Sequence, residues 1–155
     1  MREIKFRGKH IDNGEWVYGG IVHQTDCYGN EVDKYFIIDG TTTQDYDIGF
    51  EYQVIPETVG QFTGQLDRTK KEYVKIYEND IVKNTFDNSV YVVMWLNIYG
   101  YYALIPIDIY RTEEDIVDYL IDVDLDINNV YQFYNTIEVI GNIHEDNLWQ
   151  KMTAN

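Results

Sequence analysis

One stretch, from Val54 to Val82, constrains the fold of this chain more than any other. Pro56 fixes its φ angle and lacks an amide hydrogen, so a strand over residues 50–55 should end there. Beyond it, β-branched and aromatic residues fill three short runs at 58–64, 73–77 and 80–83. Short runs of this composition, separated by turn residues, are typical of antiparallel strands. The stretch therefore predicts a β-meander.

The turns of the meander make specific predictions. We expect Gly64 to open a turn and the polar residues 65–72 to form a loop. Asn79 suits a tight turn that requires a positive φ, because its short amide tolerates the left-handed region. Asp80 follows it and can accept hydrogen bonds from turn amides, while Ile81-Val82 should be buried. All of these roles are structural.

Several blocks of this sequence, in order along the chain, resemble the signature of a known family. They are REIKFRGK at 2–9, GEWVYG at 14–19, PETVGQFTG at 56–64, KIYENDIV at 75–82 and VIGNIHE at 139–145. Together they resemble the YopX family of small phage and prophage proteins. The chain departs from the family pattern at Asn79, where Gly is usual, and in the connection over 69–74. The resemblance implies a mainly β domain of phage origin, and it implies no established activity.

The rest of the chain continues the pattern of strands and turns. Near the N-terminus, Asn13-Gly14 predicts a hairpin turn, and Gly19-Gly20 predicts a bulge or a bend within a strand. The strongest strand pair is expected over 89–96 and 99–105, and we place most of the core there. A last strand over 137–143 should close the sheet.

The one helix start is at Thr112, which can cap the helix, and the acids that follow favour the positive end of the helix dipole. Apolar residues then recur at helical spacing to about Asp122. We therefore predict a mainly β, YopX-like fold: a strongly curved sheet or partly open barrel with one short helix near 112–122. The 155 residues are expected to form a single domain over 1–155, with a polar C-terminal tail from about 145.

Composition limits the function. The net charge of −15 repels nucleic-acid phosphates and anionic membranes, so neither is expected as a direct partner, whereas a basic partner protein is permitted. The sequence shows neither a signal peptide nor a transmembrane segment, and its only cysteine, Cys27, fits a reducing compartment. We expect a protein of the cytoplasm, and of the host cytoplasm if a phage encodes it.

The sequence around each candidate metal or catalytic residue lacks the motif that its chemistry requires. Alternating acids at 122–126 suggest calcium, but the helix–loop–helix calcium motif needs Gly sixth and Glu twelfth, where Ile127 and Phe133 stand. Three further types of residue offer no better pattern: the widely spaced His10, His23 and His144; Cys27, with no base beside it in sequence; and Ser89, outside any nucleophile motif. The sequence predicts no catalytic residue, no cofactor-binding residue and no metal site.

Eight acids against one base mark residues 108–126. The segment is a solvated helix face, a docking surface for a basic protein, or a mimic of nucleic-acid phosphates. We accordingly predict a non-enzymatic accessory protein that acts through protein–protein contacts and forms a homo-oligomer. The alternatives are an acidic inhibitor of a host nucleic-acid-binding protein and, less favoured, an enzyme whose site is assembled from scattered acids and histidines.

Overall fold

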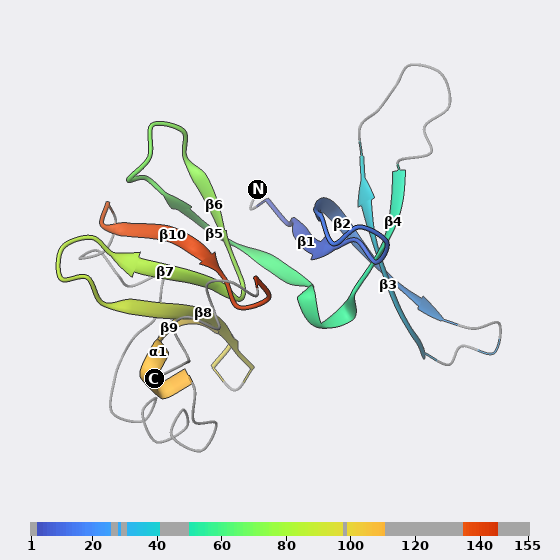
Figure 1. Cartoon of the computed structure of the whole chain (residues 1–155). Helices are drawn as coiled ribbons and strands as arrows, with labels where there is room; N and C mark the ends of the chain where they lie inside the picture. Colours follow the sequence, from blue (N-terminus) through green and yellow to red (C-terminus); the bar gives the residue numbers. More distant parts are fainter. Residues whose placement is uncertain are drawn as a thin grey trace. The chain divides into compact units, whose positions relative to one another are not determined.

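The structure is a computed structural model that describes residues 3–25, 28, 31–40, 50–97, 99–110 and 135–145 (Figure 1). In these residues the chain is mainly β, as predicted, with two antiparallel sheets that do not close into a barrel. The chain divides into two compact units, Met1–Phe62 and Thr63–Asn155. The expectation of a single domain over residues 1–155 stays a prediction.

Unit 1 contains four strands, a short 3-10 helix and the start of a fifth strand. These elements are β1 (Phe6–Lys9), β2 (Trp16–Thr25), β3 (Glu31–Asp39), β4 (Phe50–Val54), η1 (Pro56–Thr58) and β5 (Gly60–Asp67). All pairings are antiparallel, in the order β4-β3-β2-β1-β5. The predicted end of β4 before Pro56 and the turn at Gly14, whose φ is 69°, are both confirmed.

The sheet of unit 1 is strongly curved. The backbone of His10, just after β1, forms an isolated bridge with Val54 of β4, and the Ile11 amide donates to the Gln53 carbonyl at 3.0 Å. Gly8 lies against the same strand, because a Cβ atom there would meet the Val54 side chain at 3.0 Å. The missing side chain at Gly8 thus allows β1 to curl toward β4.

The glycine pair in β2 marks the place where this strand changes partner. Gly19 is opposite Phe6 of β1, whereas Gly20 is opposite Ile38 of β3. A Cβ atom on Gly19 would lie 1.9 Å from the Ile38 carbonyl oxygen, while one on Gly20 would meet nothing within 4 Å. Gly19 is therefore required by a close approach of two backbones. The register shift recorded in β2 lies further on, between His23 and Thr25.

Unit 2 contains the rest of β5, five further strands and one short helix. They are β6 (Val74–Tyr77), β7 (Asp80–Asn84), β8 (Val90–Leu96), β9 (Tyr101–Pro106), α1 (Ile107–Tyr110) and β10 (Ile137–Asn142). β6 pairs with β5, and a four-stranded sheet has the order β10-β7-β8-β9. The strand pair β8–β9, with six paired positions, and the closing strand β10 are confirmed, and β10 lies beside β7 (Figure 1).

Apolar side chains cover both faces of this four-stranded sheet. On one face a buried cluster is formed by Ile76, Val82, Val93, Tyr102, Leu104 and Ile137. On the other face, Leu96, Ala103 and Ile105 pack with side chains of α1. Neighbouring residues of β9 thus enter different clusters, which explains its continuous apolar sequence. The predicted burial of Ile81-Val82 is confirmed, since both are 0% exposed.

One prediction from the sequence is wrong, and another concerns residues that the structure does not describe. The prediction that Gly64 opens a turn into a loop is wrong: Gly64 has a φ of 90°, yet β5 continues through it to Asp67. The Thr63 hydroxyl on one side donates to the Ile76 carbonyl at 2.9 Å and accepts from the Gln65 amide at 3.1 Å, which supports the strand around the glycine. The helix predicted near 112–122 lies outside the described residues.

Candidate functional site

An open cleft of about 340 Å³ is the first candidate site, and it lies in unit 1. It is lined by Lys5, His10, Glu15, Trp16, Asp39 and Tyr52, among others. The lining residues come from the positions just before and after β1, the β1–β2 turn, β2, the end of β3 and Tyr52 of β4. The His10 ring packs edge-on against the Tyr52 ring, with centroids 5.6 Å apart.

Charged groups of the cleft differ in how far they are already engaged. The Glu15 carboxylate accepts a hydrogen bond from the Asn13 side-chain amide at 2.8 Å. His10 places its Nε2 atom 4.0 Å from the Asp12 carboxylate, and its buried Nδ1 atom has no hydrogen-bond partner. Lys5 and Asp39 line the cleft without a side-chain ion pair in the part of the chain that the structure describes.

Cations lie against Trp16 at one side of the cleft. The guanidinium carbon of Arg7 is 4.6 Å from the Trp16 ring centroid, and Nζ of Lys9 is 5.5 Å from it. Both residues belong to β1 and are two positions apart, so they share one face of the sheet with Trp16. These cation–π contacts hold the indole ring in place.

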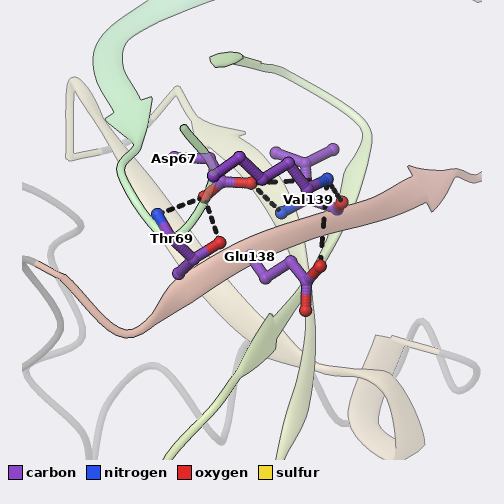
Figure 2. Close-up of polar contacts among 5 residues, drawn as sticks. Asp67, Thr69, Glu138 and Val139 are labelled. Atoms are coloured by element: carbon purple, nitrogen blue, oxygen red, sulfur yellow. Dashed lines mark hydrogen bonds and ion pairs between the residues drawn. The ribbon is translucent and has the colours of Figure 1, made fainter. Parts of the chain in front are cut away.

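The second candidate is a fully buried carboxylate in unit 2, shown in Figure 2. Asp67, 0% exposed, accepts hydrogen bonds at Oδ1 from the amide and the hydroxyl of Thr69, at 2.9 and 2.6 Å. Its Oδ2 atom accepts the Val139 amide at 2.9 Å. Three donors satisfy the two oxygens, so this carboxylate joins the end of β5 to β10 and is structural.

Lys70 extends this polar cluster. Its Nζ atom donates to the Val139 carbonyl at 2.9 Å, and it lies 3.7 Å from the Asp67 carboxylate and 3.9 Å from that of Glu138. Figure 2 shows Glu138 on β10 next to the buried acid. The polar sequence around Asp67 and Lys70 predicts a loop and does not indicate this role. An available signal was the Asp-x-Thr spacing, which suits a local turn closed by the carboxylate.

A second buried acid joins two of the blocks that carry the family resemblance. The Asp80 carboxylate, 1% exposed, accepts the Tyr77 amide at 2.7 Å, as predicted for this turn. It also accepts the Asn142 side-chain amide at 3.5 Å, and Asn142 is itself 1% exposed. Asn79, which lies between Tyr77 and Asp80 in the sequence, has the predicted positive φ, 67°. The KIYENDIV and VIGNIHE blocks are thus neighbours on β7 and β10.

The turn between β7 and β8 presents an aromatic ring to solvent. Phe86 is 87% exposed and lies in a turn with many local hydrogen bonds. Its amide donates to the Asn84 side-chain oxygen at 2.9 Å, and the Asn84 carbonyl accepts the Asn88 amide at 2.8 Å. The Asp87 carboxylate accepts the amide of Ser89 at 2.9 Å and also its hydroxyl. These hydrogen bonds fix the shape of the turn.

The candidates from the sequence belong to both units. His10 and His23 are in unit 1, where His10 is at the cleft and His23 stacks on Tyr35 with ring centroids 4.2 Å apart. His144 follows β10 in unit 2, and Ser89 belongs to the β7–β8 turn. The structure thus assigns Ser89 a part in shaping a turn.

Other candidates lie outside the described residues: Cys27, the acids at 122–126, most of the acidic segment 108–126 and the tail after 145. Within the described part, no group of three or more His, Cys, Asp or Glu side chains is arranged to hold a metal ion. The helices that the structure describes include none with the length and apolar character to span a membrane.

Comparison with known proteins gives one result. The family model described as YopX protein matches residues 5–148, which span the strands of both units. No curated protein and no solved structure matches the chain. The matched range contains nearly all of the sequence blocks that resemble the family, and these blocks contribute to β1, β2, β5, β7 and β10. The chain therefore belongs to the YopX family.

Proposed function

We propose that this YopX protein is a phage-type accessory protein that works through protein–protein contacts in the host cytoplasm, and that its first partner is another copy of itself. The observation that carries the proposal is the exposure of large aromatic side chains among the described residues of both units. They are Phe50 at 67%, Tyr73 at 61%, Phe86 at 87% and Tyr99 at 48% exposure. Burial of aromatic rings is a main source of energy at protein interfaces.

Charge sets the conditions for such contacts. The net charge of −15 on each copy opposes association, but the screening length at about 0.15 M salt is only ~8 Å. Apolar contact can then outweigh the repulsion. The same negative charge favours a basic protein as any further partner, because opposite charge speeds encounter. This feature also argues against direct binding of nucleic acid.

The test is the mass of the purified full chain by light scattering. At about 0.15 M salt the mass should exceed the 18.4 kDa of one copy, and it should fall toward that value at ~0.01 M salt, where the screening length rises to ~30 Å. A mass of 18.4 kDa in both salts at high protein concentration contradicts the proposal.

A further inference from the structure

The β7–β8 turn has the properties of a preformed binding element. Phe86 makes no ring contact within the described residues, and its ring is 87% exposed. The turn that carries it is already fixed by the hydrogen bonds of Asn84 and Asp87. A rigid element loses little conformational freedom on binding, so most of the gain from burying the ring is kept as affinity.

Charged side chains flank this ring on both sides in sequence. Lys83 precedes it and Asp87 follows it, and neither has an ion-pair partner in the part of the chain that the structure describes. Hydrogen bonds from Ser89 keep the Asp87 carboxylate in its charged form and in a fixed position. The turn therefore offers one aromatic ring between one cation and one anion.

The cleft of unit 1 offers the complementary set. Its volume of about 340 Å³ is within the range of small-ligand pockets, about 300–1,000 Å³, and so exceeds one phenyl ring. Trp16 and Tyr52 line it, and aromatic rings pair favourably with a phenyl ring. Lys5 and Asp39, both without an ion pair in the described part, add one cation and one anion.

We propose that the Phe86 ring of one copy binds in the unit 1 cleft of a second copy, where Asp87 pairs with Lys5 and Lys83 pairs with Asp39. This inference rests on the proposed self-association and names its contact surfaces. Opposite charges then meet at two places where the described residues of each copy leave charges without an ion pair. Because turn and cleft are different surfaces, the contact is heterologous and each bound copy can bind a further one.

The experiment compares the masses of variants of the full chain at about 0.15 M salt. Phe86→Ser removes the ring, and Lys5→Glu reverses the charge of the cleft; each should weaken self-association at least tenfold. Val74→Ser is the control, because Val74 is 37% exposed elsewhere in unit 2 and is not one of the exposed aromatic residues named above, and it should leave the mass unchanged. Thermal melting of Phe86→Ser should match the wild type, since the ring is 87% exposed and makes no ring contact with the described residues.

A mixing experiment separates this contact from a general loss of association. Phe86→Ser has no ring but an intact cleft, whereas Lys5→Glu has an intact ring but an altered cleft. Mixed at equal concentration, they should form a 1:1 complex that cannot grow, with twice the 18.4 kDa mass of one copy. As an independent check, Lys83→Glu and Asp39→Lys should each weaken association, and the double variant should recover it.

The outcomes distinguish the two proposals. A wild-type protein that is monomeric under all conditions overturns both. If the wild type associates and Phe86→Ser associates equally well, the proposed function stands and the contact is wrong. If the mixed variants stay apart, the assignment of the cleft as the receiving surface is wrong.

Discussion

The two units reach their folded state by different means. Among the described residues, the buried apolar side chains of unit 1 are Ile37, Val54 and Phe62, whereas unit 2 buries two apolar clusters on the two faces of one sheet. Unit 1 relies on close approach at two glycines: a Cβ atom at Gly8 would meet the Val54 side chain at 3.0 Å, and one at Gly19 would lie 1.9 Å from the Ile38 carbonyl oxygen. Among the described residues, apolar burial is therefore more extensive in unit 2, whereas unit 1 depends more on close approach at glycine.

This difference predicts where each unit is sensitive to substitution. In a unit that depends on apolar burial, removing methyl groups from the core lowers the free energy of unfolding, whereas adding a methyl group at the surface does not. Where strands approach closely at glycine, the addition of one methyl group is costly instead. The predictions below test these two sensitivities, from the largest expected effect to the smallest.

Leu104→Ala should have the largest effect, because Leu104 is 1% exposed in the larger cluster of unit 2. Leu-to-Ala changes in cores cost about 2–5 kcal/mol, from lost burial and the cavity left behind. Urea unfolding measures the loss, and amide hydrogen exchange should locate it in β8 and β9. The control is Val74→Ala in the same unit, where the side chain is 37% exposed and the cost should be well below 1 kcal/mol. Equal losses for the two variants would contradict the importance of this cluster.

Gly19→Ala should have the next largest effect. Its Cβ would lie 1.9 Å from the Ile38 carbonyl oxygen, so β2 and β3 must separate. Forced overpacking of this kind costs about 1–3 kcal/mol, occasionally more. Gly20→Ala is a matched control one position away, because its Cβ would meet nothing within 4 Å. Hydrogen exchange in β2 and β3 should rise for Gly19→Ala and not for Gly20→Ala. Similar exchange in both variants would show that unit 1 does not depend on the close approach at Gly19.

Asp67→Ala should have the third largest effect on stability. The change leaves the buried Val139 amide without its acceptor, and an unsatisfied buried donor costs about 1–3 kcal/mol. Asp87→Ala is the control, since it removes an acid from an exposed turn. Urea unfolding should show the larger loss for Asp67→Ala, and hydrogen exchange should rise at the Val139 amide. Unchanged exchange at that amide would show that the buried carboxylate does not hold β10.

The sequence predicts well those structural features that depend on residues close to one another in the chain. The positive φ at Asn79 and the hydrogen bond from the Tyr77 amide to Asp80 follow from the chemistry of a single turn. The β8–β9 pair follows from two apolar runs joined by a short connection. Local pattern fixes these elements because their partners are only a few residues away.

What the sequence does not predict depends on distant partners. The extension of β5 through Gly64 was missed because its end is held by Asp67, whose partner Val139 is 72 residues away. The cleft was missed for the same reason: Tyr52 and Trp16 line one surface only because the sheet curls between β1 and β4. Neither juxtaposition has a local sequence signal.

The smallest predicted effect concerns a carboxyl in the turn that carries Phe86. The hydroxyl of Ser89, and then its amide, donate hydrogen bonds to Asp87 and lower the pKa of that carboxyl below its ordinary value. Since the folded pKa is the lower one, this contribution to stability is present above the unfolded pKa and is lost as pH falls through the folded pKa. Ser89→Ala removes the hydroxyl, so the pKa of Asp87 should rise toward its ordinary value, which carboxyl chemical shifts measure during an acid titration. Ser89→Thr keeps a hydroxyl and should keep the pKa low. An unchanged pKa in Ser89→Ala would show that the hydroxyl does not fix the carboxylate, and that the turn is less preformed than its hydrogen bonds indicate.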